Sequence, residues 1–457
     1  MKLEMKTRKV LTSSRFKANE STALLNFDAS ARAVVIGRRL DSTSGRLGLF
    51  GKVAETAQAS SALDAGIWLD LAFPHVIGIF GARGSGKSFD LGVIAECVAG
   101  SGAVVGETQQ SWSTIIFDVQ DQFWTIAREP SDDLAEDKGQ IRAIAEWGLS
   151  ASAVSKVQLW APAGYRTPLS GVTQLQISPA QLTIEDWLAV LQLERYSPLG
   201  QALATLVRAF PNDPPTALAG RCLPSGVLSS FQTSTIEGLS WRLESLASSE
   251  LIGSSAVALD QLLTPGCVSV VLMRQLGDSM RALVVGVLTR LLADRMSFHH
   301  QAKRVARRLG STGATAQSLP DRLWLFLDEA HVVVPSGQET AATAPVIDYV
   351  KRGRDAGLSM VFATQQPSAV DPRLMSQVDM TVTHFLGFEA DLQAAIARMP
   401  TRAAFSYDIG SARAIDLPNV LRTLEPGECL IADASTGRAF AAQVRPRVTA
   451  HGGNTPT

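Results

Sequence analysis

Residues 81–88 read Gly-Ala-Arg-Gly-Ser-Gly-Lys-Ser and fit the pattern G-x-x-x-x-G-K-[ST]. In such a loop the glycines allow backbone N–H groups to turn inward and hold phosphate oxygens. Lys87 would reach the β- and γ-phosphates of a nucleotide, and the Ser88 hydroxyl would bind Mg²⁺. The pattern therefore predicts a phosphate-binding loop for ATP. Its candidate contacts are Gly81, Ala82, Arg83, Gly84, Ser85, Gly86, Lys87, Ser88 and Phe89.

The residues around this loop have the pattern that a phosphate loop requires. An apolar run at 75–80 precedes it, and apolar residues at helical spacing follow Ser88. Strand, loop and helix would then follow one another, and the helix would add the positive end of its dipole. The alternative is a glycine-rich turn that holds no ligand. The flanking pattern favours the phosphate loop.

An acidic pair supplies the second half of a hydrolytic site. The run LWLFLD at 323–328 is apolar up to Asp328, as a central buried strand would be, and Glu329 follows. Asp328 at the end of such a strand is placed to hold the magnesium shell. Glu329 could act as general base on the attacking water. The alternative for the pair is a solvated strand end.

Polar residues end two other predicted strands. The run 358–364 is followed by Gln365 and Gln366, and a side chain there could sense the γ-phosphate or orient water. We favour Gln365 over Gln366, with a simple turn before the next proline as the alternative. Asp118 ends the run 113–118 and would be a supporting acid or a strand cap.

Basic residues gather in two places. Arg352 and Arg354 lie just before the strand 358–364, and in a ring of subunits such arginines can enter a neighbour's site. A solvated basic helix end is the alternative, because it complements the helix dipole. The basic run at 303–308 could touch DNA, although a solvated helix face is the more common meaning of a charge run. We expect His331 and His384 to be structural.

The order of the predicted elements indicates an α/β fold with a mostly parallel sheet covered on both faces. The predicted strands are 75–80, 113–118, 157–162, 267–273, 323–328, 358–364 and 380–387. Helices are expected over 279–295, over 344–354 and after residue 390. The stretch 310–318 is low in complexity and predicts a surface loop.

These elements divide the chain into five predicted parts. Short β-like runs separated by Gly and Ser indicate a small β-rich domain near the N-terminus, and helical periodicity indicates an inserted lobe. The predicted ranges are 1–22 for a flexible arm, 23–65 for the β-rich domain, 66–180 with 264–445 for the core, 181–263 for the lobe and 446–457 for a tail.

Composition excludes few functions. The chain has 457 residues and a net charge of −1, so no basic field indicates a DNA-coating protein. The four cysteines form no CxxC pair, which argues against a local zinc knuckle or a disulfide framework. The sequence predicts no membrane segment and no secretory signal, so we expect a cytoplasmic protein.

The segments GARGSGKS, LFLDEAH and KRGRDAGLSMVFATQQPSAVDPRLMSQVDMTVTHFLG together resemble the HerA/FtsK superfamily, on the HerA side. The closing segment LEPGECLIADASTGRAFAAQVRPRVTAHGG is also similar to the end of HerA-type ATPases. The resemblance implies a RecA-like core, a helical lobe and an N-terminal β-barrel. It also implies a homo-hexameric ring that moves along double-stranded DNA with ATP and Mg²⁺. A nuclease or another effector protein would be its partner, in antiphage defence or DNA end processing.

On this resemblance Arg354 is the leading trans-acting arginine and Arg352 the second, and the terminal run 444–447 is expected to pack near the nucleotide or a neighbouring subunit. Two departures matter. The region before the phosphate loop is short for a barrel, and Gln122 stands where relatives often have an acid. Outside the ATP site the sequence shows no clustered metal set for a nuclease, so cutting would fall to a partner.

Two functions remain open from the sequence. One is a DNA translocase or helicase driven by ATP. The other is an ATP-regulated ring scaffold that assembles and controls an effector, with little movement of DNA. A conjugation or secretion ATPase of related fold is less favoured, because no membrane segment is predicted.

Overall fold

A computed structural model describes residues 9–453, apart from 19–23, 39–44, 58–61, 107–111, 224–225, 311–318, 400–405 and 410. The predicted surface loop therefore lies, from residue 311 onward, outside the described residues. So do residues 1–8 and 19–22 of the predicted arm and the last four residues of the predicted tail.

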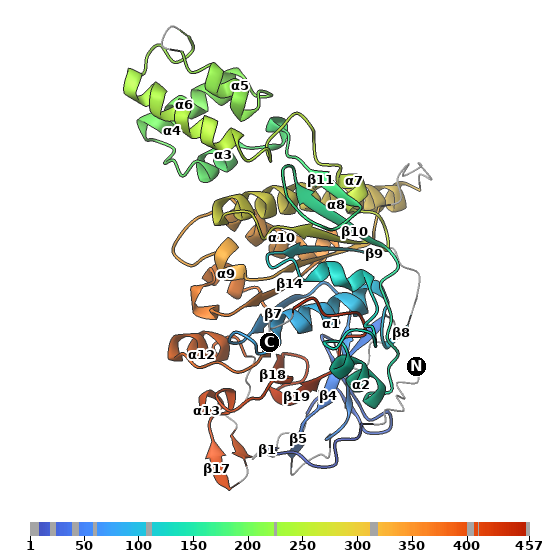
Figure 1. The fold of residues 1–457 in the computed structure, drawn as a ribbon. Coiled ribbons are helices and arrows are strands. Elements are labelled where there is room, and N and C mark those ends of the chain that lie inside the picture. Colours follow the sequence, from blue (N-terminus) through green and yellow to red (C-terminus); the bar gives the residue numbers. More distant parts are fainter. Residues whose placement is uncertain are drawn as a thin grey trace.

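One large sheet runs through the molecule and carries the site (Figure 1). Its eight neighbouring strands at one end are all parallel. In spatial order they are β11 (Val172–Leu175), β10 (Val157–Pro162), β12 (Val268–Leu272), β9 (Trp112–Asp118), β13 (Arg322–Leu327), β14 (Leu358–Thr364), β7 (Val76–Phe80) and β15 (Met380–Thr383).

The sheet continues beyond β15 with mostly antiparallel strands. These strands are β18 (Glu428–Asp433), β19 (Phe440–Val444), β4 (Leu47–Val53), β6 (Gly66–Asp70), β3 (Ala33–Ile36) and β2 (Phe27–Asp28), with β8 (Val104–Val105) beside β4. The segment predicted as a small β-rich domain thus adds its strands to the core sheet, because β4 pairs with β19. This pairing joins residues almost 400 positions apart, which no local pattern encodes.

A second, small sheet contains β17 (Ala412–Ile415), β16 (Tyr407–Ile409), β1 (Phe16–Ala18) and β5 (Glu55–Ala57). Strand β1 lies in the segment expected as a loose arm, yet Phe16 and Ala18 are buried there. The ring of Phe16 packs edge-on against that of Tyr407, with centroids 6.0 Å apart. Apolar contact therefore holds this part of the N-terminal segment in place.

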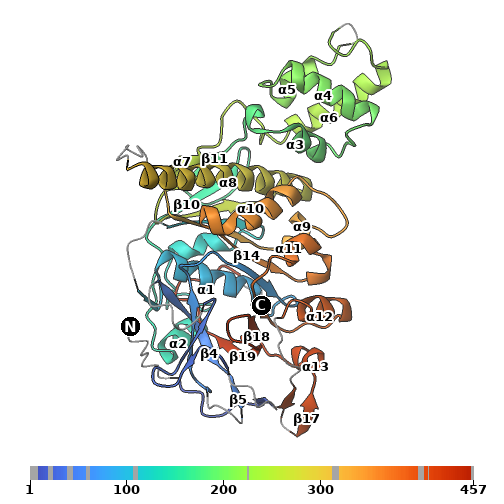
Figure 2. The same cartoon turned by 180° about the vertical axis from the view of Figure 1, so that it is seen from behind.

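Helices cover both faces of the parallel strands (Figure 2). Alternate residues of β13 face opposite ways: Leu325 and Leu327 join the core beneath α8 (Asp278–Leu309) and α10 (Thr343–Ala356), whereas Trp324 and Phe326 join the core beneath α1 (Lys87–Ala99). A strand buried on both faces needs an unbroken apolar run, which is what 323–327 provides. The predicted α/β class with a mostly parallel sheet is confirmed.

An all-helical lobe stands away from the sheet, at the top of Figure 1. It inserts between β11 and β12 and packs around buried leucines such as Leu206 and Leu239. Its helices are α3 (Ile184–Val190), α4 (Pro198–Ala209), α5 (Pro215–Gly220) and α6 (Thr233–Ala247), and α7 (Leu259–Leu262) leads back to the core.

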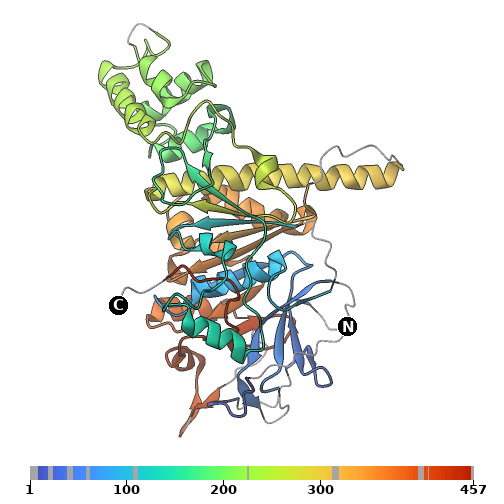
Figure 3. The ribbon, with the colours of Figure 1, turned by 45° about the vertical axis from the view of Figure 1, so that its right-hand side comes forward.

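Helix α8 is longer than the predicted 279–295 and extends beyond the sheet (Figure 3). After Met296 the residues are mostly polar and basic, so apolar periodicity no longer indicates a helix there. The helix still continues, because neither Gly nor Pro occurs between Met296 and Gly310, which caps the helix with a φ of 64°.

The remaining helices are α2 (Lys138–Glu146), α9 (Ala330–Val333), α11 (Pro372–Met375), α12 (Glu389–Ile396) and α13 (Leu417–Leu421), with short 3-10 turns at Phe123–Ala127, Pro179–Gln181 and Pro367–Ala369.

Candidate nucleotide-binding site

The predicted phosphate loop, 81–88, connects the end of β7 to the start of α1. Gly84 and Gly86 have φ angles of +77° and +114°, where a residue with a Cβ would be strained. Among the described residues, no side chain caps the first turn of α1, so N–H groups of that turn remain available to a ligand. The Ser85 hydroxyl is likewise buried without a partner in the described structure. The loop has the donors that phosphate oxygens need.

Lys87 is buried at the base of the loop. Its Nζ donates a hydrogen bond to the carbonyl oxygen of Ala82, at 2.9 Å. Burial lowers the pKa of the Lys87 ammonium, and the carboxylates of Glu329 and Asp328 oppose that shift. Phosphate oxygens in the cavity would add negative charge and stabilise the ammonium form further.

Ser88 and Asp328 lie side by side below the loop, with the Ser88 hydroxyl donating to Asp328 Oδ2 at 3.0 Å. Burial raises the pKa of Asp328 to about 6, and the charge of Glu329 adds to this rise. A hydroxyl and a carboxylate are the protein ligands that hold Mg²⁺ in P-loop NTPases. The residues present therefore fit a magnesium ion, with Ser88 and Asp328 as its protein ligands.

Glu329 is the acid that faces the cavity. Its backbone φ of 51° is uncommon for a residue with a side chain. Gln365 Nε2 donates a hydrogen bond to Glu329 Oε1, so the structure brings these two predicted residues together. Glu329 Oε2 is buried and makes no hydrogen bond within the described structure. Local strain and an unsatisfied buried oxygen are typical of functional sites.

Two histidines support these groups. His331 Nδ1 lies 3.1 Å from the Thr364 hydroxyl and 3.5 Å from Glu329 Oε2, and burial lowers the pKa of its ring. His384 lies beneath the phosphate loop, where its Nε2 is 2.7 Å from an Asp90 oxygen on α1. Both rings therefore brace the elements that carry the predicted site.

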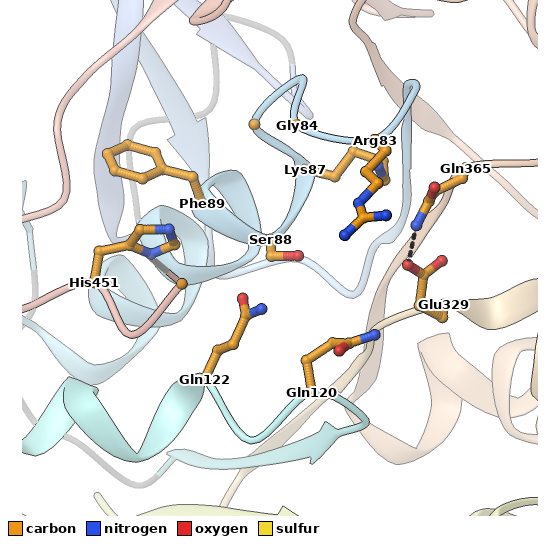
Figure 4. Close-up of a pocket in the computed structure, with 12 residues that line it drawn as sticks. Arg83, Gly84, Lys87, Ser88, Phe89, Gln120, Gln122, Glu329, Gln365 and His451 are labelled. Atoms are coloured by element: carbon orange, nitrogen blue, oxygen red, sulfur yellow. Dashed lines mark hydrogen bonds between the residues drawn. The ribbon is translucent and has the colours of Figure 1, made fainter. Parts of the chain in front are cut away.

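The cavity has a volume of about 650 Å³. Figure 4 shows Lys87 and Ser88 between Glu329 at one end and His451 at the other. Its lining combines predicted and unpredicted residues: Arg83, Gly84, Gly86, Lys87, Ser88, Phe89, Gln120, Gln122, Glu329, Gln365, His451 and Gly453.

Four of these residues were missed as site residues: Gln120, Gln122, His451 and Gly453. Only Gln122 had a local signal, because it replaces an acid that relatives often have. The two glutamines follow β9, and Asp118 positions their loop by accepting N–H hydrogen bonds from Phe123 at 2.7 Å and from Gln120 at 3.3 Å. Burial raises the pKa of Asp118 to about 7. These hydrogen bonds make Asp118 a cap at the end of β9, which is one of the two roles predicted for it.

The predicted trans-acting arginines lie away from this cavity. Arg354 is exposed near the end of α10 and lines a separate hollow with His75 and Val76, at the start of β7. The phosphate loop follows the other end of β7, so Arg354 lies at the opposite edge of the sheet. Arg352 is also exposed, and its guanidinium pairs with Asp294 on α8, at 2.7 Å.

One strand, β14, separates the strand that ends at the phosphate loop from the strand that ends at the acidic pair. A nucleotide cavity at the carboxyl ends of such parallel strands defines the protein as a P-loop NTPase with a RecA-like core. The chain belongs to the HerA family, because the family model for the central domain of helicase HerA matches residues 51–292, more than half of its length. It is therefore a P-loop ATPase of HerA type.

Solved structures agree on the fold. VirB4 of Thermoanaerobacter pseudethanolicus has a TM-score of 0.50 and 16% identity, over 88% of this chain and 97% of VirB4. The plasmid coupling protein TrwB in complex with ADP and Mg²⁺ has a TM-score of 0.50 and 13% identity, over 83% of this chain and 87% of TrwB. At these identities the likeness shows the fold alone.

No curated protein matches the sequence. Within the described part of the chain, no helix combines the length and apolar character needed to cross a bilayer.

Proposed function

We propose that this protein is a hexameric DNA translocase or helicase that hydrolyses ATP with Mg²⁺ in the cytoplasm. We further propose that it acts with a nuclease or another effector protein, in antiphage defence or DNA end processing. Membership of the HerA family supports the motor function. The observation that carries the hydrolytic function is Glu329, which faces the cavity with one oxygen held by Gln365 and the other unsatisfied.

Binding would begin at the phosphate loop. The N–H groups of the first turn of α1, which no side chain caps in the described structure, and the ammonium group of Lys87 would bind the triphosphate. Ser88 and Asp328 would hold Mg²⁺, which when bound neutralises charge on the β- and γ-phosphates. The cationic side chain of Arg83 lines the same cavity and adds to its complementarity for an anion.

Hydrolysis needs a water molecule oriented toward the γ-phosphate. Glu329 Oε2 is the acceptor for a proton of that water, because Oε1 is already engaged by Gln365. Loss of the γ-phosphate would change the surroundings of Glu329 and Gln365 together. We therefore propose that Gln365, at the end of β14, responds to the presence or loss of the γ-phosphate and transmits this difference to the neighbouring loop.

In the proposed hexamer, an arginine on α10 would act at the nucleotide site of a neighbouring subunit. An arginine at the opposite edge of the sheet can complete a site only in a neighbouring subunit, where it would stabilise transition-state charge. Arg354 is the better candidate because Arg352 is already paired with Asp294. Movement along DNA by contacts to phosphates needs no base readout, and a net charge of −1 is compatible with contacts confined to a pore.

The test is the ATPase rate with and without duplex DNA, combined with the mass of the assembly in solution. Lys87→Ala protein is the control for contaminating activity. A hexamer whose turnover rises with duplex DNA supports the motor. A hexamer that hydrolyses ATP at the same rate without DNA favours the ring scaffold instead. An intact assembly that hydrolyses no ATP under either condition would overturn the assignment.

A further inference from the structure

Residues 445–453, which we call the C-terminal strap, run from the end of β19 to the nucleotide cavity. The sequence predicts a tail over most of this segment. In the structure Arg445, Arg447 and Thr449 are completely buried. The strap is therefore part of the packed molecule and not a loose end.

Glu96 on the phosphate-loop helix α1 anchors one side of the strap. Its carboxylate accepts hydrogen bonds from Arg445 Nη1 at 2.9 Å, from the Val448 N–H at 3.2 Å and from the Thr449 N–H at 2.9 Å. A Cβ added at Gly92 would lie 2.6 Å from Arg447 Nε. The strap and helix α1 are thus in close contact around a buried charge pair.

The other side of the strap is held by the segment that follows β9. Gln140 Nε2 donates hydrogen bonds to the carbonyl oxygens of Arg447 and Thr449, at 2.9 and 2.7 Å. The Thr125 hydroxyl donates to the carbonyl oxygen of Ala450, at 2.8 Å. Because hydrogen bonds hold the strap on both sides up to Ala450, the positions of its last described residues are fixed.

The last described residues of the strap lie at one end of the nucleotide cavity. His451 and Gly453 line it, and the His451 ring meets that of Phe89 edge-on, with centroids 5.4 Å apart. Figure 4 shows this pair on the far side of Ser88 from Glu329. A nucleotide with its γ-phosphate near Glu329 and its phosphates over the loop would place its nucleoside at the His451 end.

The chemistry of His451 suits that position. Burial and the charge of Arg447 lower the pKa of the ring to about 4, so it is neutral near pH 7. Arg447 Nη1 lies 3.2 Å from His451 Nδ1, and because a guanidinium can only donate, Nδ1 must accept. The ring proton is then on Nε2. A Cβ added at Gly453 would lie 3.0 Å from this Nε2 and 3.0 Å from Gln122 Oε1, so both polar groups converge on the cavity wall.

We propose that the C-terminal strap forms the nucleoside subsite of the ATP site. His451 donates a hydrogen bond from Nε2 to the ribose or the base, and the side-chain amide of Gln122 hydrogen-bonds to the same group. The rings of Phe89 and His451 pack against its apolar surface. The inference rests on the proposed ATP-binding function, and a cavity of about 650 Å³ has the size of small-molecule sites.

The test compares two ligands by calorimetry: ADP with Mg²⁺, and inorganic tripolyphosphate with Mg²⁺. The variant is His451→Ala, with His300→Ala as matched control, since His300 is a half-buried histidine on α8. We expect His451→Ala to weaken ADP about tenfold, the loss of one hydrogen bond and one ring contact, and to leave tripolyphosphate unchanged. His451→Gln, which keeps an N–H donor, should recover most of the ADP affinity. His300→Ala should bind both ligands like the wild type.

Equal loss of ADP and tripolyphosphate in His451→Ala would overturn the inference, because the strap would then support the phosphate loop and not the nucleoside. Unchanged affinity for both ligands would also overturn it. Failure of the wild-type protein to bind either ligand would instead overturn the proposed ATP site, and the inference with it. Thermal unfolding of each variant separates these results from loss of the fold.

Discussion

Replacing Arg354 with alanine should abolish ATP turnover without weakening nucleotide binding. Arg354 is exposed and lies at the amino edge of the sheet, whereas Glu329 and the phosphate loop lie at the carboxyl edge. Strand β14 has seven residues and alone spans about 20 Å between these edges. A guanidinium cannot cover that distance, so any action on hydrolysis must occur in a neighbouring subunit.

The expected size of the effect follows from the charge that such an arginine stabilises. A trans-acting arginine contributes about 10³- to 10⁵-fold to kcat, and we expect a loss in that range for Arg354→Ala. Its own cavity stays complete, so ADP affinity should change less than about twofold. Arg352→Ala should lose much less activity, because Arg352 already pairs with Asp294.

Mixing subunits tests the action in trans. An active subunit interface needs Lys87 from one subunit and Arg354 from the next. In rings assembled at random from equal amounts of Lys87→Ala and Arg354→Ala chains, each of these residues is intact at about half of the interfaces, so about one interface in four has both. About a quarter of wild-type turnover should therefore return. Arg208→Ala, an exposed arginine in the lobe, is the control for loss of charge. No recovery at any mixing ratio, with mixed rings verified by mass, would refute the reasoning.

Three further predictions concern buried acids. Glu329→Gln should lower kcat about 10²- to 10⁴-fold while ATP still binds, as single-turnover kinetics would measure; full turnover would remove Glu329 as general base. Burial raises the pKa of Asp328 to about 6, and only the carboxylate form binds the ion. The Mg²⁺ affinity of the ADP complex should therefore fall about tenfold per pH unit below 6 and level off above 7. In the same titration, Asp328→Asn should lack the pH dependence that comes from the protein. Glu96→Gln should lower the free energy of unfolding by about 3–5 kcal/mol, because it leaves two buried arginines without their carboxylate; urea denaturation measures this, and an equal loss in the exposed Glu237→Gln would contradict it.

Local patterns predicted which residues lie together around Lys87 and Glu329, at one end of the cavity. The octapeptide at 81–88 and the acid pair at 328–329 each follow an apolar strand, and both strands are parallel and end at the same sheet edge. Gln365 follows β14, which lies between them. Three short segments therefore converge because parallel strands share one carboxyl edge.

The nucleoside half could not be predicted in this way. His451 and Gly453 reach the cavity through contacts between Glu96 and the strap, about 350 positions apart in the chain. The same limit applies to β4, whose pairing with β19 merges the N-terminal strands into the core sheet. Such contacts depend on buried charge pairs and strand pairing between distant segments, and neither has a periodic signature in the sequence.

The nucleoside end of the cavity is formed by a single chain, whereas the end at Glu329 is proposed to be completed by a neighbouring subunit. Every group proposed to bind the nucleotide before hydrolysis comes from one chain and lines one cavity. The group proposed to complete the transition state comes from the neighbouring subunit, because Arg354 lies at the far edge of its own sheet. On this proposal a single subunit binds nucleotide, whereas turnover requires the assembly. A ring built this way would load nucleotide at every site and would hydrolyse it only where two subunits are correctly docked, and this dependence would serve a motor and a scaffold alike.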